Sequence, residues 1–206
     1  TFRLTRDQLA EAYPDFLSAI DEPFADSSAL PSYLLCCATR QHVTVALSGD
    51  GADEVFGGYR KHQAELRLAQ PGALERAVAA LGPLWRTLPR SRNNRLTDTF
   101  RKLDRFAQAA QGSAEERWLS LASFDADGDA PALQPDATSP TLLAGRDRHM
   151  ARGIGQMPGM NGHLLADVHT VLANDMLHKV DLTSMAHALE VRTPFLDRRV
   201  VELAYA

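Results

Sequence analysis

The sequence has few cysteines and no long hydrophobic run. Only Cys36 and Cys37 occur among its 206 residues, and adjacent cysteines rarely form a disulfide, so a secreted protein stabilised by disulfides is excluded. No apolar run approaches the ~20 residues that a membrane helix needs, and no charged-then-apolar signal segment opens the chain. We therefore expect a cytoplasmic protein that does not act on a membrane.

The chain also lacks a large excess of charge of either sign. Its 22 basic and 26 acidic residues give a formal net charge of -4, which argues against nucleic-acid binding through bulk positive charge. The seven histidines show no metal-ligand spacing such as His-Glu-x-x-His. With 45% hydrophobic and 23% charged residues, the composition is typical of a folded globular protein.

Helical periodicity and helix start signals recur along the chain. Thr5 to Gln8 has the form of a capping box, and apolar residues from Leu9 to Ile20 then repeat at helical spacing despite Pro14. Residues 123–140, rich in Asp, Ala and Pro, indicate an exposed loop. We expect further helices at Pro31–Thr39, at Tyr59–Ala69, along the Phe100–Ala110 stripe, after the Ser113-x-x-Glu116 capping box and through Leu164–Leu172.

An apolar strand followed by an acidic glycine loop is the most informative segment. Val43–Leu47 is a short β-branched run that predicts a strand buried on both faces of a parallel sheet. Ligands of open α/β sheets bind beyond the carboxyl ends of strands, where glycines let the backbone approach a phosphate. Asp50, Asp53 and Glu54 place negative charge there, and a Mg²⁺ ion would reconcile this charge with a phosphate ligand. A solvated turn with Asp53 or Glu54 as a helix cap explains the same residue types equally well.

Three separated segments resemble the glutamine-hydrolysing asparagine synthetases. Residues Ser48 to Tyr59 resemble that family's S-G-[DE]-G-x-D-E-x-F-G-G-Y segment, and the loop from Asp21 to Ser28 also resembles the family. Residues Lys179 to Asp197 contain K-V-D-x-x-S-M-A-H and L-E-V-R-x-P-F-L-D, which look like its second signature. The segments occur in the family's order, and the resemblance is weak between about Gln63 and Met160.

The resemblance implies an α/β fold: a helix-rich portion of an adenine nucleotide alpha hydrolase-like (ATP-pyrophosphatase) domain with few parallel strands. It implies a ligase that uses ATP and Mg²⁺ to join aspartate to ammonia from a glutaminase domain, by way of β-aspartyl-AMP. No nucleic acid or membrane takes part in this reaction, and a homodimer is left open.

The resemblance also assigns roles by matching position. Ser48, Gly49 and Gly51 would contact the nucleotide, and Asp53 falls where related ATP-pyrophosphatases have a Mg²⁺ ligand. Asp50 falls where the family has a carboxylate tied to ammonia attack, and a carboxylate is able to accept the proton that ammonium must lose.

Several residues have a functional and a structural interpretation. Lys179 would either contact pyrophosphate or stabilise the fold. Arg192 would either pair with an acidic residue across the cleft or join Glu190 and Asp197 in a buried network of ion pairs and helix caps. For Arg192 the buried network is the simpler explanation. Loop capping explains the loop residues at least as well as a substrate pocket does. The secondary candidates are Asp21, Asp26, Ser27, Glu54 and Arg192.

Residues 1–206 match part of the family's C-terminal synthetase domain. The family's S-G-G-x-D-S pyrophosphate loop, its N-terminal nucleophilic cysteine and a downstream lysine in a K-x-G-F-like segment have no match in this range. We therefore expect a piece of a longer enzyme that is inactive by itself. One alternative is a related cyclase that closes an amide ring after the same adenylation, although β-lactam synthetases have a tyrosine where this chain has Asp50. The other is a degenerate, non-enzymatic domain of the same fold.

Overall fold

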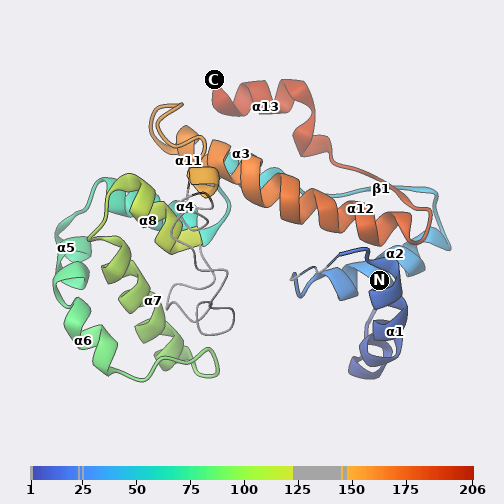
Figure 1. The fold of residues 1–206 in the computed structure, drawn as a ribbon, viewed down its shortest axis with the longest axis horizontal. Helices are drawn as coiled ribbons and strands as arrows, with labels where there is room; N and C mark the ends of the chain where they lie inside the picture. Colours follow the sequence, from blue (N-terminus) through green and yellow to red (C-terminus); the bar gives the residue numbers. More distant parts are fainter. Residues whose placement is uncertain (1, 23, 25, 123–144, 146–147) are drawn as a thin grey trace. The chain divides into compact units, whose positions relative to one another are not determined.

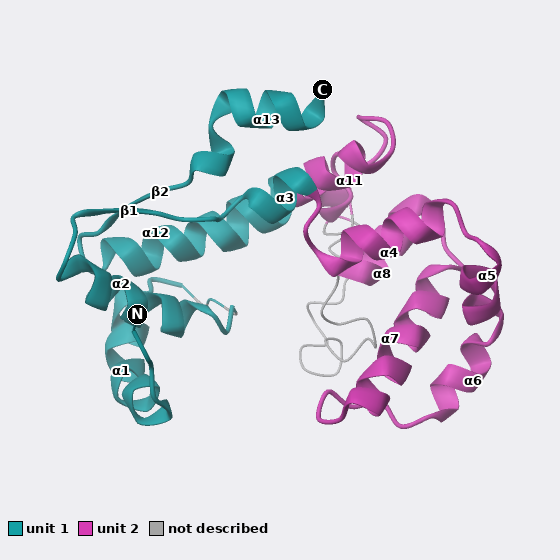
Figure 2. Ribbon diagram, turned by 180° about the vertical axis from the view of Figure 1, so that it is seen from behind, with its two compact units in different colours: residues 1–56, 168–206 teal, residues 57–167 magenta. Residues whose placement is uncertain are grey.

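A computed structural model of the chain describes residues 2–22, 24, 26–122, 145 and 148–206. The chain divides into two compact units, shown in Figure 2: Thr1–Phe56 together with Val168–Ala206, and Gly57–Asp167. The loop predicted at residues 123–140 lies outside the described residues. Within the described part, none of the helices is long and apolar enough to cross a membrane.

Unit 1 is made of helices around one short sheet. Helix α2 packs against both α1 and α12, and α13 contacts α3 (Figure 1). Its elements are α1 (Arg6–Ala19), α2 (Ala29–Arg40), β1 (Val45–Leu47), α3 (Ala52–Phe56), the π-helix η2 (Val168–Met176), α12 (Leu177–Met185), β2 (Glu190–Arg192), the 3₁₀ helix η3 (Pro194–Leu196) and α13 (Arg198–Tyr205).

Helix starts in unit 1 follow the local sequence signals. The Thr5 hydroxyl accepts from the Gln8 backbone N–H at 3.3 Å, and the Gln8 side chain accepts from the Thr5 N–H at 2.9 Å. This reciprocal pair satisfies two backbone donors at the start of α1 and confirms the predicted capping box. Helix α2 is also confirmed, beginning at Ala29 rather than at Pro31.

The sheet confirms the parallel pairing but not the burial predicted for its strand. Strands β1 and β2 pair in parallel, with Ala46 opposite Val191. Leu47 is 73% exposed and Val45 is 38% exposed, so the prediction of a strand buried on both faces is wrong. The reason is that the described residues give β1 a single neighbouring strand of three residues, and its alternate side chains therefore have little cover.

The described residues of unit 2 form helices and one isolated β-bridge, between Ile154 and Met157. Helix α7 contacts α5, α6 and α8, and α4 contacts α8 and α11. The helices predicted at Tyr59–Ala69, along Phe100–Ala110 and after Ser113 are confirmed. Leu164 to Leu172 is helical as predicted, but the part from Val168 onward, in unit 1, is π-helical. The elements are α4 (Arg60–Ala69), α5 (Ala73–Ala80), α6 (Gly82–Thr87), α7 (Arg95–Ala109), α8 (Ala114–Ala122) and α11 (Met160–Asp167).

A buried polar network lies in the core of unit 2. Asp167 is fully buried, with its Oδ1 2.5 Å from the Lys61 ammonium and its Oδ2 2.7 Å from Nε2 of His62. The His62 ring stacks on the buried Trp118 indole, with 5.7 Å between ring centroids. Glu65, also buried, accepts from the Arg117 guanidinium at 2.8 Å and 3.3 Å. Each buried carboxylate of this network therefore has a cationic partner, as burial of a charge requires.

Candidate functional site

The predicted acidic glycine loop begins at the carboxyl end of β1. The Ser48 backbone N–H donates to the Arg192 carbonyl at 2.8 Å, which extends the pairing of the two strands by one residue. The Ser48 hydroxyl donates to the Asp50 carboxylate and accepts from the Asp50 backbone N–H at 3.3 Å. The Ser48 hydroxyl thus fixes the orientation of a half-buried carboxylate at the end of the strand.

Gly51 and Gly49 meet different surroundings in this loop. Gly51 has a φ of +90°, and a Cβ built on it would lie 2.4 Å from a methyl carbon of Leu196 in η3. Gly49 is exposed, and apart from its chain neighbours no described residue would have an atom within 4 Å of a Cβ there. The turn therefore requires glycine at position 51 to pack on η3, whereas the open side of position 49 leaves its backbone accessible to a ligand.

Replacing Gly51 with alanine is expected to lower the free energy of unfolding by about 2–4 kcal/mol, the sum of a left-handed backbone penalty and a steric clash. Urea denaturation of Gly51→Ala and of Gly49→Ala measures the difference. The Gly49 variant, which meets no atom, should stay within about 1 kcal/mol of the unmodified protein. Equal losses in the two variants would contradict the role given to Leu196.

The other two carboxylates of the loop differ in exposure. Asp53 is exposed on the first turn of α3, whereas Glu54 is buried, with 1% of its surface accessible. Among the described residues, no three His, Cys, Asp or Glu side chains converge to hold a metal. Mg²⁺ is commonly bound through one or two carboxylates together with substrate phosphates and water. Of the two carboxylates, Asp53 is therefore the one exposed to a bound ion, and the described residues do not form a metal site by themselves.

Lys179 and Asp26 are both predicted candidates, and they form an ion pair whose side chains are only 10% and 16% exposed. The Lys179 ammonium lies 2.8 Å from Asp26 Oδ2, 3.0 Å from the Ser28 hydroxyl and 3.4 Å from the Met176 sulfur. Asp26 also accepts from the Ser28 backbone N–H at 2.8 Å. Burial raises the pKa of Asp26, but the hydrogen bonds from Lys179 and Ser28 outweigh it and hold the pKa below its usual value.

These contacts link α12 to the loop that precedes α2. Because all three ammonium protons of Lys179 have acceptors, Lys179 would have to release one of them to contact pyrophosphate. The structural interpretation of Lys179 and the loop-capping interpretation of Asp26 both have support in this geometry. No hydrogen bond or ion pair joins Lys179 or Asp26 to Ser48 or Asp50 in the part of the chain that the structure describes.

Asp175 lies close enough to Asp26 and Lys179 to interact with both charges, although it was not among the predicted site residues. Burial and the nearby Asp26 carboxylate raise its pKa, and Lys179 partly opposes the rise. The sequence feature that could have identified Asp175 is its position four residues before Lys179, which places the two side chains on one helix face. Asp175 stands in the last turn of η2, and π-helical turns are frequent at functional sites.

The remaining candidates are exposed. Arg192 pairs with Glu190 at 2.7 Å, two positions away on β2, and Asp197 Oδ1 accepts from the Arg199 backbone N–H at 2.9 Å as the cap of α13. The predicted ion pair and helix cap are therefore confirmed. The predicted burial is wrong, because the Arg192 and Glu190 side chains are 65% and 55% exposed on a strand with little cover. Asp21 and Ser27 are exposed in the loop before α2.

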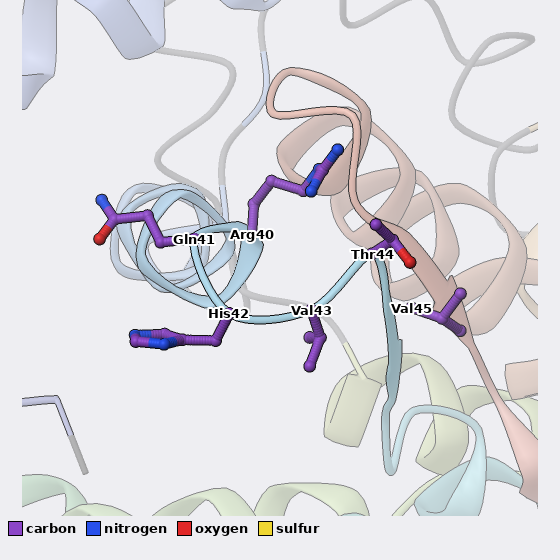
Figure 3. Close-up of a pocket in the computed structure, with 6 residues that line it drawn as sticks. All are labelled: Arg40, Gln41, His42, Val43, Thr44 and Val45. Carbon is purple, nitrogen blue, oxygen red and sulfur yellow. The ribbon is translucent and has the colours of Figure 1, made fainter.

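A hollow of about 490 Å³ lies at the opposite end of β1. Figure 3 shows its lining, a continuous segment between α2 and β1 in which Gln41 and His42 point away from Thr44 and Val45. Arg40 in this segment donates to the Ala188 carbonyl at 3.0 Å. None of the predicted site residues lines the hollow, because they follow the carboxyl end of the strand and the hollow precedes its start.

Comparison with known proteins gives one family over the whole chain. The family model described as asparagine synthase matches residues 1–206. A Mycobacterium tuberculosis (strain H37Rv) protein named as a glutamine-hydrolyzing asparagine synthetase is 29% identical over 206 residues, covering 98% of this chain and 30% of the relative. Asparagine synthetase [glutamine-hydrolyzing] 1 of Bacillus subtilis (strain 168) is 27% identical over 208 residues, with the same two coverages.

A third relative matches a shorter stretch more strongly. A Methanocaldococcus jannaschii protein named as a glutamine-hydrolyzing asparagine synthetase is 60% identical over 42 residues, which cover 20% of this chain. The chain spans about 30% of the length of the bacterial relatives above. No solved structure matches the chain.

Proposed function

The chain belongs to the asparagine synthase family, and we propose that it is part of the synthetase domain of an enzyme that makes asparagine from aspartate, ATP and glutamine-derived ammonia. The observation that carries the proposal is the Ser48–Asp50 loop at the carboxyl end of β1, in a chain that matches the family throughout. Residues 1–206 would be one section of the C-terminal synthetase domain, within an adenine nucleotide alpha hydrolase-like fold in a cytoplasmic enzyme.

The proposed reaction has two steps. A carboxylate oxygen of aspartate attacks the α-phosphorus of ATP and pyrophosphate leaves; ammonia then attacks the activated carbonyl carbon and AMP leaves. The attacking nitrogen must lose a proton, and a carboxylate held within hydrogen-bond reach is able to accept it. Asp50 is suited to this task because the Ser48 hydroxyl fixes its orientation while it stays half-exposed.

The open face of the loop is the proposed nucleotide contact. Ser48 and Gly49 would meet the nucleotide, and the open space that the described residues leave around a Cβ at Gly49 supports a close approach of the backbone. Gly51 would act beside them by holding the turn against Leu196. Asp53 would hold Mg²⁺, which when bound neutralises charge on the phosphate oxygens.

Lys179 and Asp26 would act by positioning. Their ion pair ties α12 to the loop that carries Asp21 and Ser27, whose exposed side chains would line the aspartate or adenylate pocket. In this proposal Lys179 keeps the loop in place and meets pyrophosphate only by giving up one of its contacts.

Replacing Asp50 with asparagine tests the proposal on the full polypeptide that contains residues 1–206. We expect asparagine formation to fall about a hundredfold, in the range of a lost general base, because the amide cannot accept the proton. Aspartate-dependent exchange of pyrophosphate into ATP should persist, because adenylation does not need this base. Product AMP and asparagine are measured by chromatography, and circular dichroism verifies the fold.

A matched control is Glu11→Gln, which removes an exposed carboxylate on α1 and should leave both rates unchanged. Unchanged asparagine formation in Asp50→Asn would refute the role of Asp50. Exchange that depends on a different carboxylic acid and not on aspartate would refute the substrate and favour the cyclase alternative. Absence of exchange with every acid tested would favour the non-enzymatic alternative.

A further inference from the structure

A basic cleft in unit 2 has no part in the reaction proposed above. It has a volume of about 460 Å³ and lies among α4, α7 and α8. Among the described residues, its lining carries six cationic side chains and no acidic one. They are Arg60, Lys61 and Arg67 from α4 with Arg101, Lys102 and Arg105 from α7.

The counter-charges around the basic cleft do not balance these cations. Asp98 pairs with Lys102 and Arg101, whose hydrogen bonds lower its pKa to about 2, so it is ionised at neutral pH. Asp167 pairs with Lys61 but also contacts the His62 ring through its second carboxylate oxygen. Among the residues that the structure describes, the printed ion pairs thus set two carboxylates against the six cations of the lining, which leaves this part of the cleft with a net positive charge.

Two of the arginines are available to a ligand. Arg60 and Arg67 are exposed, and neither makes a hydrogen bond or ion pair with another residue in the part of the chain that the structure describes. Arg105 donates to the Ser120 carbonyl at 3.0 Å, and Arg101 is held by Asp98 at 2.7 Å. The two anchored guanidinium groups on α7 therefore form a fixed wall, and the two unanchored ones on α4 are free to close on an anion.

The rest of the lining is apolar or neutral. Phe106 and Leu121 are partly exposed, and Ala64 and Gln63 complete the lining from α4. Phe106 lines the cleft together with the arginines, and an aromatic side chain is a surface on which a base or another flat ring is able to stack. The cleft thus offers an anion-binding wall together with a small apolar surface.

We propose that the basic cleft binds a small polyphosphate, either inorganic or attached to a nucleoside, through residues other than those of the Ser48–Asp50 loop. Guanidinium forks match phosphate oxygens in a bidentate manner, which favours phosphate over a point-charge partner. The volume falls in the range of small-molecule sites, and the cations gather in one hollow instead of forming a long stripe, which disfavours an extended nucleic acid.

Isothermal titration calorimetry on the full polypeptide tests the proposal, with inorganic tripolyphosphate and ATP as separate probes. The variant is Arg60→Glu combined with Arg67→Glu, and the control is Arg76→Glu combined with Arg95→Glu, which makes the same charge change at exposed positions that do not line the cleft. We expect the Kd for tripolyphosphate to rise at least tenfold in the variant and less than twofold in the control. Raising the salt concentration from about 0.05 to about 0.5 M should weaken binding to the unmodified protein.

The probes distinguish the two sources of polyphosphate. If the variant loses one of two ATP-binding events seen with the unmodified protein, the ligand is a nucleotide. If it loses tripolyphosphate binding while its ATP binding is unchanged, the ligand is an inorganic polyphosphate. Equal Kd values for tripolyphosphate in the variant and the unmodified protein would overturn the proposal. Tighter binding of a 20-nucleotide single strand or a polyglutamate peptide, lost in the same variant, would also overturn it in favour of a macromolecular partner. Asparagine formation does not enter these readouts, so the proposed function and this site can fail separately.

Discussion

Asp167→Ala is expected to destabilise unit 2 by about 3–5 kcal/mol, the usual cost of removing one partner of a buried ion pair. The variant leaves Lys61 and His62 without the carboxylate that both contact at 2.5–2.7 Å. His62 is 2% exposed, so water cannot easily replace the lost partner. Denaturant unfolding measures the loss, followed by the fluorescence of Trp85 and the buried Trp118, both in unit 2.

Asp98→Ala is the matched control for this prediction. Asp98 also pairs with two cations, Arg101 and Lys102, but its side chain is 23% exposed. Solvent and salt weaken surface pairs, so the control should lose much less stability than Asp167→Ala. Similar losses in the two variants would mean that burial does not determine the strength of these pairs.

Lys179→Met is expected to destabilise unit 1 by about 3–5 kcal/mol, for the same reason at a second site. Methionine keeps an unbranched chain of similar length but leaves Asp26 and the Ser28 hydroxyl without the ammonium. Lys102→Met is the control, since Lys102 is 48% exposed and belongs to a surface pair. Denaturant midpoints and slopes for both variants give the free energies of unfolding.

The dependence on pH provides a second readout for Lys179→Met. The folded state lowers the pKa of Asp26, so the stabilisation from its ionised form is complete above its unfolded pKa of about 3.9. It disappears as the pH falls through the lower pKa of the folded state. The difference between the unmodified protein and Lys179→Met should therefore shrink between about pH 5 and pH 2. A difference that stays constant over this range would show that packing of the lysine stem, and not the ion pair, stabilises the loop.

Features encoded by neighbouring residues could be predicted from the sequence. The α1 and α8 caps each use a hydroxyl and a side-chain acceptor three residues apart, so Thr5 and Ser113 were enough to locate them. Similarly, the β-branched run before Ser48 predicted β1, because β-branched side chains are enriched in strands.

Features that join distant parts of the chain could not be predicted. Lys179 and Asp26 are 153 residues apart, and the sequence around either residue does not indicate that the two pair. Strand β2 has only three residues and no distinctive pattern, so the partner of β1 was missed. The exposure of Leu47 was missed for the same reason, because burial depends on which elements cover a strand and not on the strand itself.

The interrupted chain path of unit 1 has a consequence for the order of folding. Unit 2 is one continuous stretch, Gly57–Asp167, whereas unit 1 needs residues from both sides of that stretch. During synthesis, unit 2 can fold as soon as it leaves the ribosome, whereas β1 emerges long before its only described partner strand, β2. The backbone of β1 therefore stays unpaired, and open to pairing with another chain, until about 145 more residues have been added.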